Sequence, residues 1–76
     1  MIKQLYLFST PHCHLCELAH SLAIKIPDTS VIVIDVADDD FLLVEYGVRI
    51  PVLQRPETKA ELDWPFSEDE ILDLLK

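Results

Sequence analysis

Both cysteines of this chain, Cys13 and Cys16, lie in the stretch "STPHCHLCELAH", residues 9 to 20. The same stretch contains all the histidines of the chain, which are His12, His14 and His20. Two thiols at this spacing can cycle between dithiol and disulfide, bind a metal ion, or serve as small packing residues. A bridge across so short a loop adds little stability, so the pair is a poor structural cross-link. The spacing therefore favours redox or metal chemistry.

A zinc site is the first alternative to a redox pair, because "HCHLC" offers four zinc ligands within five residues. A closed tetrahedral site usually takes its second pair of ligands from a distant segment. Apart from His20, the chain has no further cysteine or histidine. We therefore expect redox-competent thiols and assign no residue to a metal. Zinc within one chain and an iron–sulfur cluster shared between two chains stay as alternatives.

The cysteines stand at the start of a predicted helix, residues 13–26. Its apolar residues recur at helical spacing and predict one buried stripe, made of Leu15, Leu18, Ala19, Leu22 and Ile26. At about 100° per residue, Cys13 lies away from this stripe and Cys16 lies near its edge. We expect an exposed Cys13 and a shielded Cys16. Disulfide exchange needs one accessible thiolate to attack and a second thiol to release the mixed disulfide.

The N-terminal end of a helix favours a thiolate, because unpaired N–H groups and the positive end of the helix dipole stabilise the negative sulfur. We therefore expect the pKa of the Cys13 thiol to lie below its ordinary value. His12 and His14 flank Cys13 and, when protonated, strengthen this effect, whereas Glu17 opposes it. The alternative is that both histidines are simple exposed loop residues. His20 is expected on the solvated face of the helix.

Four strands are predicted, at residues 3–9, 31–36, 50–54 and 59–64, and the last two form an antiparallel hairpin. The run "VIVIDV" is nearly continuous in its apolar character, which is typical of a central strand covered on both faces. Its Asp35 is either a strand-end residue facing water or a proton relay behind Cys16.

Two further helices are predicted, at residues 38–47 and after Ser67. The first has an acidic first turn and ends at Gly47, which we expect in the left-handed conformation. The second begins with a capping box made by Ser67 and Glu70 and a hydrophobic staple between Phe66 and Ile71. The segment 64–66 is expected to pack as core, or else to line a substrate groove.

The predicted order is β-α-β-α-β-β-α, which indicates an α/β fold with a four-stranded mixed sheet and flanking helices. The first two strands are joined through a helix and should be parallel, with a right-handed crossover. At 76 residues, with half of them apolar, the chain is expected to form a single domain over residues 1–76.

The charge balance limits the partners. Fourteen acidic side chains against six basic ones give a net charge of −8. A polyanion is repelled by such a surface, so we expect no nucleic acid and no acidic membrane as a partner. The chain has no apolar run long enough to span a bilayer and no visible secretory signal, and we expect a cytoplasmic monomer.

The sequence resembles the glutaredoxin-like branch of the thioredoxin superfamily over nearly its whole length. The resemblance rests on "CHLC" after the first strand, then a short acidic helix, then "YGVRIPVL". It implies a thioredoxin-like fold, with Cys13 as nucleophile and Cys16 as resolving thiol. It also implies a cis peptide bond between Ile50 and Pro51 that faces Cys13. Because Pro51 has no N–H, we expect the backbone of Ile50 to be free to pair with an extended peptide substrate.

The resemblance also concerns glutathione as a possible co-substrate. Glutaredoxins carry a Gly-Gly pair before the last helix, and here that region reads "DWPFSEDE", which is bulky and acidic. A lysine ahead of the first cysteine is also missing. Arg49 is a candidate to hold a substrate carboxylate, and the alternative is an ordinary surface charge.

We therefore predict a small thiol–disulfide oxidoreductase without a bound cofactor, in which Cys13 and Cys16 are catalytic. The residues expected to contact substrate are His12, His14, Arg49, Ile50 and Pro51. Its partners would be a disulfide-containing protein or a small thiol or disulfide. The alternatives are an adaptor module of the same fold with little turnover, and a metal or iron–sulfur carrier that uses the same cysteines.

Overall fold

The chain folds into four strands, three α-helices and one 3-10 helix over residues 2–76, which are the residues that the computed structural model describes. Met1, with which the expected domain begins, lies outside the described residues. The elements follow in the order β1 (Lys3–Ser9), α1 (His14–Ala23), β2 (Thr29–Asp35), η1 (Val36–Asp38), α2 (Asp40–Tyr46), β3 (Val52–Arg55), β4 (Ala60–Asp63) and α3 (Glu68–Leu74). This order confirms the prediction and adds one short 3-10 helix, η1, between β2 and α2.

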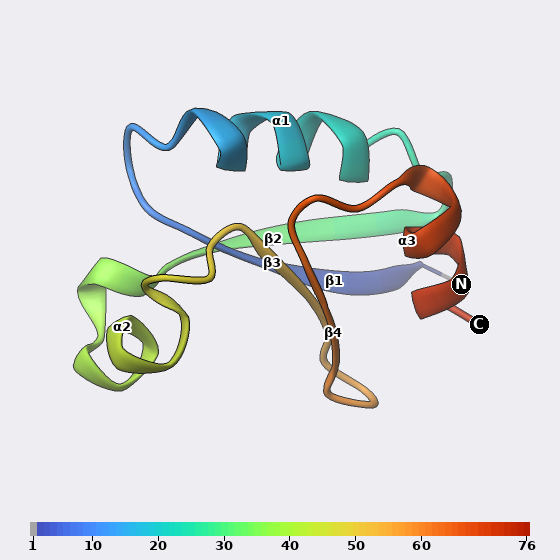
Figure 1. Ribbon diagram of the computed structural model, residues 1–76. Helices are drawn as coiled ribbons and strands as arrows, with labels where there is room; N and C mark the ends of the chain where they lie inside the picture. The colour runs from blue at the N-terminus through green and yellow to red at the C-terminus, as the bar shows by residue number, and fades with distance from the viewer. Residues whose placement is uncertain (1) are drawn as a thin grey trace.

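The strands form one mixed sheet in the order β2-β1-β3-β4, with helices on both of its faces (Figure 1). β1 runs parallel to β2, with Leu7 opposite Val33. β3 is antiparallel to β1 and to β4. The predicted four-stranded mixed sheet, the parallel pair joined through α1 and the antiparallel hairpin are all confirmed.

The prediction that the "VIVIDV" strand is central is wrong, because β2 is an edge strand that pairs with β1 alone. Ile32 and Val33, which point to opposite faces, are 40% and 52% exposed. The central strands are β1 and β3, whose apolar side chains are almost fully buried. β-branched residues favour any extended backbone, so an apolar run alone does not fix the position of a strand in the sheet.

Alternation along β1 divides the core into two clusters. Leu5 and Leu7 point to the face covered by α1 and α3, where they pack with Ala19, Leu53 and Ile71. Their neighbour Phe8 points to the opposite face and packs under α2, in a cluster that also holds Val36, Tyr46 and Val52. Successive side chains of a strand alternate between faces, so both faces of β1 are covered.

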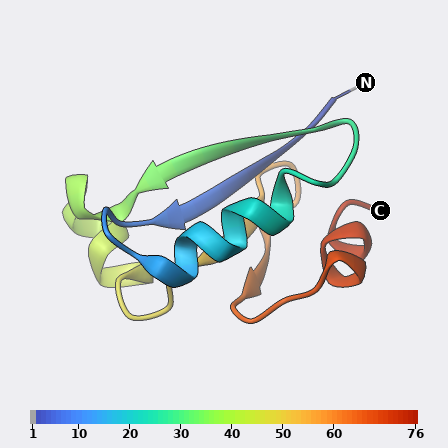
Figure 2. The same ribbon diagram turned by 90° about the horizontal axis from the view of Figure 1, so that it is seen from above.

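The buried face of α1 differs in part from the prediction. Ala19 and Ile26 are buried as expected, and Leu22 is partly buried against the core. Leu15 and Leu18 are 48% and 45% exposed, whereas Cys16, Ala19 and Ala23 are buried. These three residues follow a second helical stripe, one residue out of phase with the leucines. Their short side chains let the helix backbone lie close to the sheet, and Leu15 and Leu18 are left on its flank. Figure 2 shows that α1 does not lie over β2, because β1 runs between the two in this view.

The end of α2 also differs from the prediction, because Gly47 is not left-handed but has a φ of −53° and a ψ of −34°. A Cβ atom at this position would collide with the carbonyl oxygen of Leu43, so close approach explains the glycine. Among the described residues, positive φ angles occur instead at His12, Asp28 and Lys59. The outer face of α2 is apolar and exposed, with Phe41 and Val44 at 72% and 84%.

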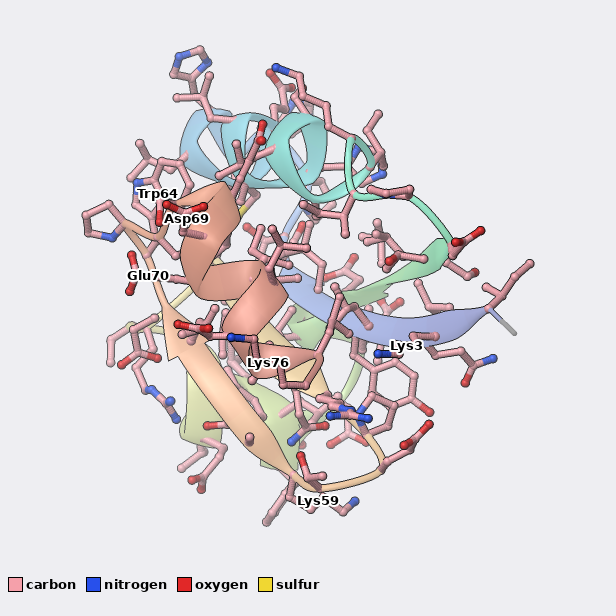
Figure 3. All side chains as sticks on the ribbon, turned by 90° about the vertical axis from the view of Figure 1, so that its right-hand side faces the viewer. Lys3, Lys59, Trp64, Asp69, Glu70 and Lys76 are labelled. Carbon is pink, nitrogen blue, oxygen red and sulfur yellow. A yellow bond between two sulfur atoms is a disulfide. The ribbon has the colours of Figure 1, made fainter. Side chains whose placement is uncertain are left out.

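The predicted capping box of α3 is confirmed. The backbone N–H of Glu70 donates to Ser67 Oγ at 3.2 Å, and the N–H of Ser67 donates to Glu70 Oε1 at 3.1 Å. Phe66 and Ile71 are buried in the same cluster, as the hydrophobic staple requires. Figure 3 shows Trp64, Asp69 and Glu70 together at the start of this helix. Within residues 2–76, no helix is both long and apolar enough to cross a membrane.

Candidate functional site

Cys13 is the N-cap of α1, and its sulfur accepts a hydrogen bond from the backbone N–H of Cys16 at 3.2 Å. The carbonyl oxygen of Cys13 accepts the first helical bond, from Glu17 N, at 3.1 Å. The first N–H groups of a helix have no partner within the helix, so an N-cap side chain that accepts one of them is stabilised there. The start of α1 therefore holds the Cys13 sulfur against a backbone donor.

Cys13 and Cys16 are joined by a disulfide, with their Cα atoms 5.2 Å apart. This separation lies within the usual range for a bridged pair. Cys13 is partly exposed, whereas Cys16 is 4% exposed and faces the sheet. The expected difference in exposure between the two cysteines is confirmed. One sulfur is open to a reactant from solvent, and the other is covered by protein.

The histidines next to the cysteines lie at the exposed end of α1. His12 occupies the left-handed region, with a φ of 63°, in the turn that leads from β1 into α1. His14 turns toward Glu17, with its Nδ1 atom 3.8 Å from Glu17 Oε2, and both side chains are largely exposed. His20, expected on the solvated face, is only half-exposed. The helix thus brings together His14, which is next to Cys13, and Glu17, which is one turn further along.

The peptide bond between Ile50 and Pro51 is cis, as the resemblance implies, and Trp64–Pro65 is a second cis bond that the sequence analysis did not anticipate. Pro51 is fully buried and leads into β3. In both ribbon views β3 begins beneath the N-terminal end of α1 (Figures 1 and 2). The chain entering β3 therefore approaches the end of α1 that carries the disulfide.

The backbone of Ile50 is not wholly free, in contrast to the prediction. Its N–H donates to the carbonyl oxygen of Tyr46 at 3.0 Å, and the carbonyl oxygen of Pro51 accepts from Trp64 N at 3.2 Å. These two bonds anchor the segment to the end of α2 and to the residue after β4. The local sequence did not reveal them, because both partners are outside the Ile50–Pro51 motif.

Arg49 contacts two carboxylates of β4. Its guanidinium donates to Glu61 Oε1 and to Asp63 Oδ1, each at 2.9 Å. The hydrogen bonds to Glu61 and Asp63 raise the pKa of Arg49 above its ordinary value. A guanidinium that already binds two carboxylates is less available to a third. Arg49 thus ties the segment before Pro51 to the edge of the sheet.

Tyr46 and Gln54 complete this network on Glu61. The Tyr46 hydroxyl donates to Glu61 Oε2 at 2.6 Å, and Gln54 Nε2 donates to the same oxygen at 3.1 Å. The Tyr46 ring stacks on Phe8, with the ring centroids 4.1 Å apart. The hydrogen bond to Glu61, and then burial, raise the pKa of Tyr46 to about 12. Burial pushes the pKa of Glu61 upward, but the hydrogen bonds from Tyr46 and Arg49 outweigh it, so that pKa is lowered.

A groove of about 470 Å³ opens beside the disulfide. Leu7 and Val33 form its floor, the segment 9–13 forms one rim, and α1 supplies the wall through Cys16, Glu17, His20 and Ser21. The predicted elements did not indicate this groove. The spacing of Cys13, Glu17 and Ser21, each four residues apart, was the available signal for a shared helix face.

The metal-binding alternatives would need further ligands close to the cysteines. Within the part of the chain that the structure describes, no three His, Cys, Asp or Glu side chains are grouped so that they could hold a metal ion. Cys13 and Cys16 are also bound to each other. The arrangement of the described side chains thus offers disulfide chemistry at this site.

Comparisons with known proteins agree with this geometry. The family model "Glutaredoxin-like domain (DUF836)" matches residues 4–76. An X-ray structure of the target protein XcR50 from X. campestris is 34% identical, with a TM-score of 0.83, and the match covers 93% of each chain. A solution structure of XcR50, also 34% identical, has a TM-score of 0.80 and covers 93% of this chain and 90% of that one. No curated protein matches.

Proposed function

Because the chain belongs to the glutaredoxin-like family, with a thioredoxin-like α/β fold, we propose that it is a small thiol–disulfide oxidoreductase. The observation that carries this proposal is the disulfide between a partly exposed N-cap sulfur, Cys13, and a buried sulfur, Cys16. An exposed thiol that accepts a backbone N–H is suited to attack, because that bond stabilises its thiolate. A buried neighbour is suited to resolve the product.

The proposed reaction passes two electrons from the dithiol to a disulfide substrate. The Cys13 thiolate attacks one substrate sulfur, and the other sulfur leaves as a thiolate that takes a proton from solvent. The Cys16 thiol then loses its proton and attacks the Cys13 sulfur of the mixed disulfide. This step forms the Cys13–Cys16 bridge and releases the second substrate thiol.

Residues around the dithiol are proposed to receive the substrate. The carbonyl oxygen of Ile50 is the backbone group that an extended peptide would use, because the N–H of Ile50 is already bonded to Tyr46. Pro51 follows it and is buried, so its role is to support this backbone from within, and His12 and His14 border the exposed side of Cys13. Arg49 acts as a positioning residue, since its bonds to Glu61 and Asp63 hold the segment that leads to Pro51.

The test is single-turnover oxidation of the reduced protein by hydroxyethyl disulfide, a small neutral substrate. The wild-type protein should form the Cys13–Cys16 bridge, measured by alkylation of the remaining thiols and mass spectrometry. Cys16→Ser should stop at a mixed disulfide on Cys13, and Cys13→Ser should show almost no reaction. A wild-type rate no higher than that of an unactivated thiol would instead indicate an adaptor with little turnover.

A further inference from the structure

The groove between α1 and the sheet opens onto the dithiol, and most of its lining beyond the cysteines and His12 has no role in the reaction described above. It lies along the flank of α1 that borders β2, and its wall and rim include both cysteines. Its volume of about 470 Å³ falls in the range of small-molecule sites, roughly 300–1,000 Å³. Val33 in its floor is 52% exposed, since α1 does not cover β2 (Figure 2).

The groove has an apolar floor, and its other lining residues are mostly polar. Leu7 and Val33 give an apolar floor, and the hydroxyls of Ser9, Thr10 and Ser21 give hydrogen-bonding groups. Among the described residues that line the groove, Glu17 carries the one carboxylate, none is a lysine or an arginine, and His12 and His20 are the side chains that become positive when protonated. An anionic ligand would meet Glu17 without a fixed positive partner, whereas an ammonium group would be attracted to it.

The basic side chains lie elsewhere in the molecule. Arg49 is bound to Glu61 and Asp63, and Arg55 donates to Glu57. The nearest charged neighbour recorded for Glu17 is His14, at 3.8 Å and with both side chains largely exposed. When His12 and His20 are neutral, the charge of the groove therefore rests on the Glu17 carboxylate, within a chain whose net charge is −8.

We infer that this groove is the binding site for a small cationic disulfide of the aminothiol class, with Glu17 attracting its ammonium group. The inference rests on the proposed function and names a substrate class for it. The Cys13 thiolate attacks one sulfur of the bound disulfide, and the first aminothiol leaves and takes up a proton. Cys16 then loses its proton and displaces the second aminothiol. The protein dithiol is oxidised and the ligand disulfide is reduced by two electrons.

The experiment compares three disulfides of different charge. Reduced wild-type protein is mixed with cystamine, hydroxyethyl disulfide or glutathione disulfide, and the second-order rate of bridge formation is measured for each. Every rate is divided by that of the same disulfide with dithiothreitol, because disulfides differ in leaving-group reactivity. The expected order of normalised rates is cystamine first, the neutral disulfide second and glutathione disulfide last.

Two variants test whether the preference for cystamine arises from Glu17 and from the groove. Glu17→Gln should lower the ratio of cystamine to hydroxyethyl disulfide by about two- to fivefold, the size of one exposed charge pair. Val33→Trp should fill the groove and lower the cystamine rate by about tenfold, equivalent to one lost contact of ordinary strength. Its matched control is Ile32→Trp, which places the same tryptophan on the opposite face of β2 and should leave the rate unchanged.

Intrinsic thiol reactivity is checked by the rate at which iodoacetamide alkylates Cys13, which should be equal in Val33→Trp and the wild type. Two results overturn this inference alone. One is an equal change of the cystamine rate in Val33→Trp and Ile32→Trp. The other is a ratio of the cystamine rate to the hydroxyethyl disulfide rate that Glu17→Gln leaves unaltered. No reaction of the wild-type protein with any of the three disulfides overturns the proposed function and this inference with it.

Discussion

The guanidinium of Arg49 donates to the carboxylate of Glu61 at 2.9 Å, and this contact links the segment before Pro51 to β4. The same carboxylate accepts from Tyr46 at the end of α2. A charged acceptor strengthens each of these hydrogen bonds, and partial burial reduces screening by solvent. Glu61 therefore links β4 to the stretch of chain between the end of α2 and Pro51, and its removal should affect both Tyr46 and Arg49.

The hydroxyl of Tyr46 provides a direct measure of this network. Its pKa is raised to about 12, mainly by the hydrogen bond to Glu61. Glu61→Gln should move the titration of Tyr46 back toward its ordinary value of 10.0, because the accepting carboxylate is lost. The measurement is a tyrosinate absorbance titration in a Tyr6→Phe background, so that the signal belongs to Tyr46. An unchanged titration would show that Glu61 is not the cause.

Tyr46 also makes stability depend on pH in the alkaline range. Because its pKa is higher in the folded protein, its stabilising contribution is fully present below pH 10 and is lost as the pH rises toward 12. The free energy of unfolding of the wild-type protein should fall across this window. Tyr46→Phe should show a smaller fall when both proteins are unfolded by urea at pH 9 and pH 11.

Glu61 should make the free energy of unfolding depend on pH in the acidic range. Its lowered pKa means that its contribution is present at neutral pH and is lost as the pH falls below its ordinary value of 4.5. We expect Glu61→Gln to reduce the free energy of unfolding at pH 7 by about 1–2 kcal/mol, since charged hydrogen bonds are lost. The loss should shrink at pH 3. The control, Glu57→Gln, removes an exposed partner of Arg55 and should cost less than about 0.5 kcal/mol.

Local sequence signals predicted the elements well, since they depend on short spacings. The capping box of Ser67 and Glu70 and the hairpin after Pro51 follow from residues a few positions apart. The position of β2 at the sheet edge does not, because strand order depends on long-range pairing that no local pattern encodes. The contact between Arg49 and Glu61 is hidden for the same reason, as twelve positions separate the two residues.

The face of α1 shows a different limit of sequence reasoning. The predicted stripe combines Leu15, Leu18 and Leu22 with Ala19 and Ile26. Cys16, Ala19 and Ala23 follow an alternative stripe that shares Ala19 with it, so periodicity alone allows either to be buried. Hydrophobicity favoured the leucines. The structure buries the smaller residues, because they allow close approach of the helix to the sheet. The same choice places Glu17 and Ser21 along the groove, which explains why that groove was missed.

A pair of α1 variants tests which stripe is buried. Ala23→Leu adds bulk at a position with no exposed area, outside the predicted stripe, and should lower the free energy of unfolding by about 1–3 kcal/mol through overpacking. Leu18→Ala removes a half-exposed side chain and should cost less than about 1 kcal/mol. Both residues are good helix formers, so propensity does not separate the variants. Urea denaturation measures both, and the reverse ranking would favour the leucine stripe.

The difference in exposure between the two sulfurs should appear in their alkylation. In the reduced protein at neutral pH, we expect iodoacetamide to modify Cys13 at least about tenfold faster than Cys16, because reactivity follows access and thiolate character. Peptide mapping after short exposure assigns the sites. Faster modification of Cys16 would reverse the proposed roles of nucleophile and resolving thiol.

Glutathione should be a poor co-substrate for this chain. The region before and within the first turn of α3 carries Asp63, Glu68, Asp69 and Glu70. Asp63 is paired with Arg49 and Glu70 caps Ser67, which leaves Glu68 and Asp69 as exposed charges without such a role. Like charges repel the anionic tripeptide, so turnover in a glutathione-coupled assay should be weak and should rise with salt as the repulsion is screened.

Neutralising these two carboxylates should relieve the repulsion. Glu68→Gln combined with Asp69→Asn should raise glutathione-coupled turnover at low salt by about two- to fivefold, as expected for exposed charges. The matched control, Asp28→Asn with Glu57→Gln, removes the same net charge from other parts of the surface, and asparagine tolerates the left-handed backbone of residue 28. Equal gains in both double variants would assign the effect to net charge alone. Efficient wild-type turnover, unchanged between low and high salt, would contradict the prediction, because it would require a glutathione site that these carboxylates do not reach.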